Sequence, residues 1–396
     1  MIDLGIALIA EQGPCFLAKD DLFKHTYILG KTGTGKSTFM LNLALEVINS
    51  GWACIFIEPK GSVIAALNSM VDKDRVVKVS IDHPITINPL RKKGRHINDL
   101  ISEFGEVLDI LVAQTSSNPE LTVMMKEIVT QAILCFDEKQ RNLDYLYEFL
   151  RSPYIREKHF ENKYRPQYWQ DVAIDPTSKK PKATIFQESA TRLATRLAGM
   201  VADPRIKKIV CGENELDIGQ IAEQKQVLLA DTSMMTFDNR VYITSLIAHY
   251  VKSYVEFERR KHPLIVFIDE FQTAISPVFS HLLALARGYK VGFVLAHQEF
   301  GQIDKSVLKS VLGNANTIVC FAIGYDEADR MRHEYGGGVK ADDFIKLDDY
   351  VSLIKIKNKV HRVMTFAPPD MPEPVFEELP PDSKVWNFMR EGWFPC

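Results

Sequence analysis

The chain has 396 residues, of which 46% are apolar and 25% charged, and its net charge is −3. This length and composition are typical of a folded protein with one large domain and one inserted or appended domain, and they exclude wholesale disorder. The small net charge gives no sign of nucleic-acid binding, which would have to depend on local basic clusters. Six cysteines without a C-x-x-C pair predict reduced thiols and no zinc site. There is no basic leader and no apolar run of about 18 residues, so we expect a cytoplasmic protein without a secretory signal or transmembrane helix.

Residues 30–37 match the phosphate-binding loop pattern G-x-x-x-x-G-K-[ST] without a mismatch. A short apolar run predicts a strand at 27–29, and the apolar residues from Phe39 to Ile48 predict a buried helix after the loop. In such a loop, backbone N–H groups surround a polyphosphate, Lys36 binds the β- and γ-phosphates, and Ser37 is a ligand of Mg²⁺. We therefore predict that ATP and Mg²⁺ bind to Gly30, Lys31, Thr32, Gly33, Thr34, Gly35, Lys36, Ser37 and Thr38. The alternative is a glycine-rich turn that only joins a strand to a helix.

Apolar runs that alternate with helical patterns predict an α/β fold, with a mainly parallel central sheet flanked by helices in three layers. Residues 1–29 are expected to form a hairpin around Gly13-Pro14, followed by the strand that precedes the phosphate-binding loop. The other expected strands are 52–57, 76–79, 226–231, 264–270, 291–298 and 317–323.

The region from 97 to 200 has no strand-like run, and its apolar residues recur at helical spacing. We therefore expect an inserted all-helical domain at 97–200. It would interrupt a RecA-like nucleotide-binding domain made of 1–96 and 201–370. Inside the insertion, the polar stretch from Tyr164 to Lys182 predicts a long surface loop. Residues 371–396 are expected to form a C-terminal tail.

The five apolar residues 264–268 are followed by Asp269 and Glu270, a pattern that resembles a Walker B strand. An ATPase needs one acid near the magnesium held by Ser37 and a second carboxylate to polarise the attacking water. We assign Asp269 the first role and Glu270 the second, the alternative being two solvated acids at a strand tip.

Two further residues are candidates for the same site. Gln298, at the polar end of the next strand, is either a sensor of the γ-phosphate or a satisfied strand-end amide. Arg287 is a candidate arginine finger, although a lone arginine at a helix end is more often a surface residue that matches the helix dipole.

Taken together, six motifs resemble those of the FtsK/HerA superfamily of DNA-pumping P-loop ATPases, and within it the TraG/TraD-type coupling proteins of conjugative type IV secretion. The motifs are His25 to Thr38, Glu58-Pro59-Lys60-Gly61, Asn88-Pro89-Leu90, Asp269-Glu270-Phe271, Ala286-Arg287-Gly288-Tyr289 and Ala296-His297-Gln298. The resemblance covers roughly residues 1–370. It implies that Lys36 and Ser37 bind Mg-ATP, that Asp269 and Glu270 run hydrolysis, and that Gln298 senses the γ-phosphate.

The resemblance also implies a ring, usually a hexamer, with DNA in its channel, and an arginine at the position of Arg287 that acts on the neighbouring subunit's nucleotide. Relaxosome or secretion-channel proteins are the implied partners. Glu58 stands where these proteins commonly have Asp. Membrane-bound coupling proteins also carry N-terminal transmembrane helices, whereas this chain starts almost directly at the ATPase core. We therefore expect any recruitment to the inner membrane face to depend on a partner.

The sequence leaves several functions open. The first is an ATPase that pumps DNA through a ring, with the basic clusters 91–95 and 355–359 either lining the channel or forming solvated faces. The second is a HerA-like ATPase of DNA processing or packaging. The third is a nucleotide-switched recruitment protein without motor activity. A small-molecule phosphotransferase fits less well, because Glu270 directly after Asp269 favours activation of water.

Overall fold

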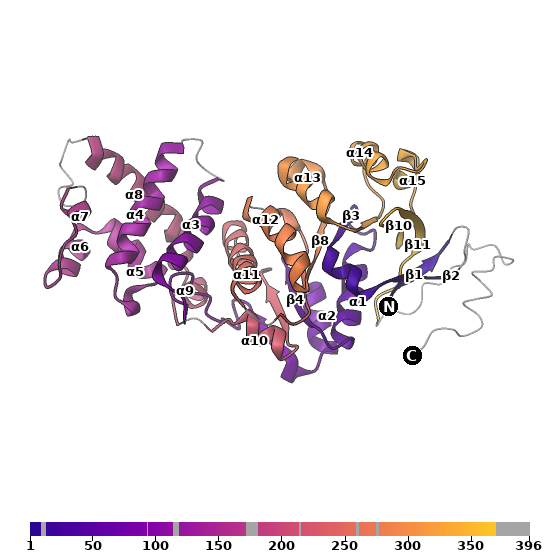
Figure 1. The fold of residues 1–396 in the computed structure, drawn as a ribbon, viewed down its shortest axis with the longest axis horizontal. Helices are drawn as coiled ribbons and strands as arrows, with labels where there is room; N and C mark the ends of the chain where they lie inside the picture. Colours follow the sequence, from indigo (N-terminus) through magenta and orange to yellow (C-terminus); the bar gives the residue numbers. More distant parts are fainter. Residues whose placement is uncertain are drawn as a thin grey trace. The chain divides into compact units, whose positions relative to one another are not determined.

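The computed structural model describes residues 1–8, 13–92, 94–113, 119–171, 181–213, 215–258, 261–274, 277–303 and 305–369. The expected tail at 371–396 lies outside these residues. The chain divides into two compact units. The first consists of Met1–Val77, Gly219–Ala230 and Val255–Cys396, and the second of Lys78–Ile218 and Asp231–Tyr254. Figure 1 traces both units.

The first unit is built on a large sheet with the strand order β2-β1-β11-β10-β9-β3-β8-β7-β4-β6-β5. The strands are β1 Ile2–Ala7, β2 Gly13–Leu17, β3 Thr26–Leu29, β4 Ala53–Glu58, β5 Val76–Val79, β6 Val227–Asp231, β7 Leu264–Ile268, β8 Val291–His297, β9 Thr317–Cys320, β10 Val351–Ile356 and β11 Lys359–Met364. The pairs β3–β8, β3–β9, β4–β7 and β7–β8 are parallel. The mainly parallel sheet predicted from the apolar runs is therefore confirmed.

One end of the sheet is antiparallel. β1 and β2 form the predicted hairpin, and β10 joins β9 and β11 in antiparallel pairs. The hairpin of β10 and β11 is absent from the predicted strands. The sequence there is rich in lysine. The hairpin is buried mainly at the start of β10 and the end of β11, so it lacks the long apolar run of the central strands.

Helices cover both faces of the central strands. The helices of this unit are α1 Lys36–Asn49, α2 Ser62–Met70, α10 Ile218–Glu223, α12 Pro277–Ala286, α13 Lys305–Asn314, α14 Tyr325–Tyr335 and α15 Ala341–Ile345. α1 buries Met40 and Val47 in one cluster with Ile28 and Phe267 of the sheet. On the opposite face, the ring of Phe279 in α12 packs on Phe293, with 5.3 Å between centroids. The result is the expected three-layer arrangement (Figure 1).

The second unit is helical in its described residues. Its helices are α3 Ile97–Ala113, α4 Pro119–Cys135, α5 Leu143–Arg151, α6 Pro153–Phe160, α7 Gln167–Asp171, α8 Pro181–Val201, α9 Pro204–Val210 and most of α11 Phe237–Phe257. The unit is wider than 97–200, because α11 bonds to its other segments. Tyr250 donates to the carbonyl of Asn88 at 2.9 Å, and Lys252 pairs with Glu106 at 2.7 Å.

The expectation of one continuous loop from Tyr164 to Lys182 is wrong in part, because only 164–166 are irregular among its described residues. Residues 167–171 form α7, and α8 begins at Pro181, while 172–180 lie outside the described residues. Trp169 is 1% exposed, donates from Nε1 to the carbonyl of Gln131 at 3.2 Å, and packs its ring on Phe149. Burial of one large aromatic side chain therefore orders a segment that is polar on average. No helix in the described part of the chain is long and apolar enough to cross a membrane.

Candidate nucleotide site

The register of the parallel strands brings three predicted segments to one edge of the sheet. Leu29, the last residue of β3, lies opposite His297 at the end of β8, and Ile268 at the end of β7 lies opposite Leu295. The loop after Leu29, Gln298 after β8, and the acids after β7 therefore emerge at the same carboxyl edge, where open α/β sheets bind ligands.

The phosphate loop is folded back on its own lysine. Gly33 and Gly35 have φ angles of 87° and 106°, a region that favours glycine, and α1 begins at Lys36. The Lys36 ammonium is buried and donates to the carbonyl oxygens of Gly30 and Lys31, the latter at 2.7 Å. Burial lowers its pKa to about 8, against the opposing charges of Asp269 and Glu270. An ammonium held at the centre of the loop is well placed to exchange these carbonyls for phosphate oxygens.

Only one of the two carboxylate oxygens of Asp269 is hydrogen-bonded among the described residues. Its Oδ1 accepts the backbone N–H of Glu270 at 2.9 Å. Its Oδ2 is buried and has no hydrogen-bond partner among the described residues. Burial and the neighbouring charge of Glu270 raise the pKa of Asp269. An unpartnered buried carboxylate oxygen beside a phosphate loop fits the ligand shell of a magnesium ion.

Glu270 lies within a network of polar side chains. It has a φ of 51°, unusual for a residue other than glycine, which marks a strained strand end. Its Oε2 accepts from Gln272 Nε2 at 2.7 Å, and its Oε1 pairs with Lys60 Nζ at 3.1 Å. Burial opposes ionisation, but the bonds from Gln272, Lys60 and Gln298 outweigh it and lower the pKa of Glu270. The carboxylate is therefore held ionised, as a base must be.

Gln298 bridges the loop and this carboxylate. Its Nε2 donates to Glu270 Oε1, and its Oε1 accepts from Thr32 Oγ1 at 2.8 Å. Both ends of the amide are thus bonded to residues of the candidate site. The structure brings together the loop, Asp269, Glu270 and Gln298 as the sequence predicts.

Arg287 is not part of this group in its own chain. It is exposed and follows α12 in a 3₁₀ turn, Arg287–Tyr289, that precedes β8. Gln298 follows the other end of β8, whose 7 residues separate the two side chains by about 20 Å at a rise of about 3.3 Å per residue. Arg287 therefore lies at the amino edge of the sheet, opposite the loop.

Glu58 has a structural position that the sequence does not reveal. Its carboxylate is fully buried and accepts from Ser62 Oγ and from the backbone N–H of Ile64, each at 3.0 Å. These bonds satisfy the first turn of α2. Burial raises the pKa of Glu58.

The two basic clusters are largely engaged within the chain. Arg91 pairs with Glu213 at 3.1 Å, and Arg95 pairs with Glu103. In the second cluster, Lys355 donates to the carbonyl of Glu334, and Lys357 lies 3.5 Å from an oxygen of Asp21. These partners reduce the charge that either cluster presents, which favours the interpretation as solvated, internally paired faces.

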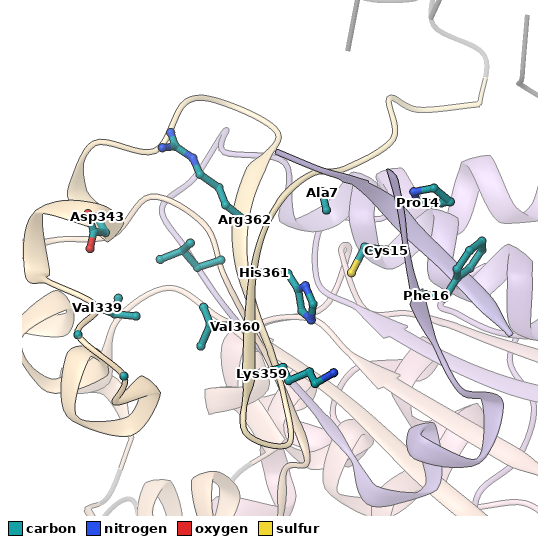
Figure 2. A pocket seen from close by; sticks show the side chains of 13 residues that line it. Ala7, Pro14, Cys15, Phe16, Val339, Asp343, Lys359, Val360, His361 and Arg362 are labelled. Carbon is teal, nitrogen blue, oxygen red and sulfur yellow. The ribbon is translucent and has the colours of Figure 1, made fainter. Parts of the chain in front are cut away.

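A separate hollow of 680 Å³ lies beside β11 (Figure 2). Lys359 and His361 point toward Cys15 and Phe16 of β2, whereas Arg362 points to the opposite side of the strand. The basic side chains that line the hollow therefore lie on two sides of β11. The lining of the hollow shares no residue with the loop or the acids of the nucleotide site.

Sequence reasoning missed the contact of Tyr350 with the loop. Tyr350 precedes β10, and its backbone N–H donates to the carbonyl of Thr34 at 3.0 Å. A tyrosine after two aspartates gives no motif, so no sequence signal identifies this long-range contact.

Fold and site together define a P-loop NTPase of RecA-like architecture. Two family models match the sequence. "Helicase HerA, central domain" matches residues 4–152, and "TraM recognition site of TraD and TraG" matches residues 263–332. The resemblance to the FtsK/HerA superfamily and its conjugative coupling proteins is thereby confirmed. A comparison with curated protein sequences gives no match.

Solved structures show the same fold at low identity. The bacterial conjugative coupling protein TrwBdeltaN70, in an unbound form, is 13% identical with a TM-score of 0.71, over 92% of this chain and 89% of that chain. The plasmid coupling protein TrwB in complex with ADP and Mg²⁺ is 13% identical with a TM-score of 0.67, over 93% and 96%. VirB4 of Thermoanaerobacter pseudethanolicus is 13% identical with a TM-score of 0.65, over 93% and 97%.

Proposed function

We propose that the chain hydrolyses ATP with Mg²⁺ at the edge formed by the loop and the Walker B strand. The observation that carries this proposal is the hydrogen-bonded series from Thr32 through Gln298 to Glu270, which links a phosphate loop to an ionised carboxylate. Lys36 binds the terminal phosphates, Glu270 accepts a proton from the attacking water, and Gln298 responds to the γ-phosphate.

Magnesium would be held by Ser37 and Asp269 together with the phosphates, and would neutralise charge that develops on them. The unpartnered Oδ2 of Asp269 fits this role. Within the described ranges no cluster of three His, Cys, Asp or Glu residues suits a metal. The bound nucleotide therefore completes the ion's ligand shell in this proposal.

In this proposal the chain is the subunit of a DNA motor. Six copies form a closed ring that pumps DNA during conjugative transfer. Support comes from the two matched models and from the structural likeness to a conjugative coupling protein. The position of Arg287 at the amino edge also supports it. In a head-to-tail ring, an exposed arginine remote from its own site can reach the nucleotide of the next subunit. A HerA-like role in DNA processing or packaging would use the same machinery.

A recruitment protein without motor activity is the second candidate. The observation that favours it is the match of residues 263–332 to a model named for recognition of TraM, which points to a relaxosome partner. Nucleotide would then switch binding of that partner. This candidate predicts slow turnover that DNA does not change.

Steady-state ATP turnover of the full chain, with and without single- and double-stranded DNA, separates the two candidates. The motor proposal predicts several-fold faster turnover with at least one form of DNA, and abolished turnover in Lys36→Ala. Lys309→Ala is the matched control, because Lys309 is an exposed lysine of α13 outside the loop. Turnover that no DNA form stimulates would contradict the motor proposal and favour the switch.

A further inference from the structure

Tyr350 lies on the flank of the phosphate loop opposite the catalytic acids. Leu29 at the end of β3 is paired with Cys320 of β9, which in turn is paired with Leu353 of β10. Because β10 runs antiparallel, its first residues lie at the edge where the loop begins. In the order β10-β9-β3-β8-β7, Tyr350 is thus two strands from β3 on one side, and Glu270 two strands on the other, each at about 10 Å.

The backbone of Tyr350 is strained and firmly held. Its φ is 62°, a region that a bulky side chain rarely adopts and that costs free energy. Its N–H donates to Thr34 O at 3.0 Å, while its own carbonyl accepts from Thr365 N at 2.8 Å and Thr365 Oγ1 at 2.9 Å. Surrounding structure fixes this conformation, and a strained residue held in this way commonly serves a binding site.

The ring lies directly against the start of α1. A Cβ atom added to Gly35 would lie 3.0 Å from Cδ1 of Tyr350 and 3.2 Å from its Cα, so only glycine fits there. Tyr350 is nevertheless only half-buried. A held aromatic ring beside a phosphate loop, with surface left accessible, has the properties of a stacking platform.

We propose that Tyr350 is the platform on which the nucleobase of the bound nucleotide stacks. This inference rests on the proposed function, in which the terminal phosphate faces Glu270 and Gln298. The nucleoside end of the same molecule then leaves the loop on the other flank, toward β9 and β10. Stacking uses the π-face of a base and does not read its edges, so this platform accepts adenine and guanine alike. The substrate class is nucleoside triphosphates, without selection by the edges of the base.

The test uses two substitutions that keep the bulk at residue 350. Tyr350→Phe keeps a π-face, and Tyr350→Leu removes it. Tyr154→Ala is the control, because Tyr154 is an exposed tyrosine in α6 of the helical unit. Affinity is measured for the full chain with Mg²⁺ by competition of ATP, GTP and inorganic tripolyphosphate against a fluorescent ATP analogue, and circular dichroism checks the fold of each variant.

The platform predicts that Tyr350→Leu lowers the affinity for ATP and GTP about 10- to 100-fold and changes the affinity for tripolyphosphate by no more than about twofold. Tyr350→Phe should leave all three affinities unchanged. Unchanged ATP affinity in Tyr350→Leu, or an equal loss for tripolyphosphate, would overturn the platform, the second result showing mere support of the loop. A Tyr350→Leu chain that does not fold would also overturn it, since the ring would then be structural. If the wild-type chain binds neither ATP nor tripolyphosphate, the proposed function itself fails.

Discussion

The side-chain amide of Gln298 donates to Oε1 of Glu270 while accepting from the hydroxyl of Thr32 in the phosphate loop. A displacement of Thr32 by bound nucleotide would break one of these bonds and free the amide to reorient. The position of the Glu270 carboxylate, the proposed base, would then change with the state of the loop.

Replacement of Gln298 by alanine should reduce kcat about 10- to 100-fold with little change in nucleotide affinity, because the amide positions reacting groups without holding the nucleotide. Turnover and equilibrium binding measured on the same preparation check this. Gln224→Ala is the control, since Gln224 is an exposed glutamine. An equal loss of affinity and rate would show instead that Gln298 only supports the loop.

Glu270→Gln should lower the hydrolysis rate at least 100-fold and leave ATP bound, because the amide keeps the shape of the side chain but accepts no proton. The measurement is single-turnover hydrolysis alongside retention of ATP on a filter. Glu299→Gln changes an exposed glutamate near the end of β8 and should have no effect. Normal turnover in Glu270→Gln would remove Glu270 from the role of base.

An arginine that acts between subunits predicts complementation. Arg287→Ala and Lys36→Ala should each be inactive, yet a mixture of the two should regain part of the turnover, because mixed rings contain sites with an intact loop and a neighbour's Arg287. Lys309→Ala, which removes an exposed cation of α13, should stay active alone. A mixture no more active than its components would place Arg287 outside the site.

Nucleotide affinity should fall as pH rises above about 8. Burial lowers the pKa of Lys36 to about 8, and the phosphates bind the charged form, so binding takes up a proton above that pH. From pH 8 to 9 the dissociation constant should rise up to about tenfold, while below pH 7.5 it should be flat with respect to this group. Lys36→Arg keeps its charge throughout and should lack this dependence. A flat wild-type profile to pH 9.5 would contradict the assignment.

Stability of the helical unit should depend on Glu103. Its carboxylate contacts Arg95 and lies 3.2 Å from Nε2 of His249. Burial opposes its ionisation, but these partners outweigh burial and lower its pKa to about 2. Because the folded pKa lies below the ordinary value of 4.5, this stabilisation is present above pH 4.5 and is lost as pH falls toward 2.

Glu103→Gln should therefore lower the free energy of unfolding by about 3 kcal/mol at pH 7, because it leaves Arg95 without its buried counter-charge. Asp99→Asn removes a more exposed acid, 4.0 Å from the same arginine, and should cost less than about 1 kcal/mol. Thermal and urea unfolding of both variants compare the two. Equal effects would show that burial does not distinguish the pairs.

Local patterns in the sequence predict the parts of the site that lie within one strand and its following turn. The loop at 30–37 needs only its glycines and the flanking strand and helix, and Asp269 follows a continuous apolar run. Their meeting at one edge follows from parallel strand order, as does the approach of Gln298. The type of each element, and the edge of the sheet at which the site lies, can therefore be predicted from hydrophobic periodicity alone.

Contacts between distant segments were not predictable in this way. Tyr350 reaches the loop only through the register of β9 and β10, and its positive φ is a cost that no propensity favours. Glu58 appears as a strand-end acid in the sequence, whereas the fold turns it onto the first turn of α2. Likewise α7 depends on where Trp169 is buried, which average polarity conceals.

The measurement that tests the central claim most directly is ATP-driven displacement of streptavidin from the biotinylated end of a DNA strand or duplex. The account predicts displacement by the wild-type chain that requires ATP and Mg²⁺, stops in Glu270→Gln, and weakens as salt rises. Hydrolysis of ATP without displacement from any DNA form, in the presence of assembled rings, would contradict a DNA-pumping function.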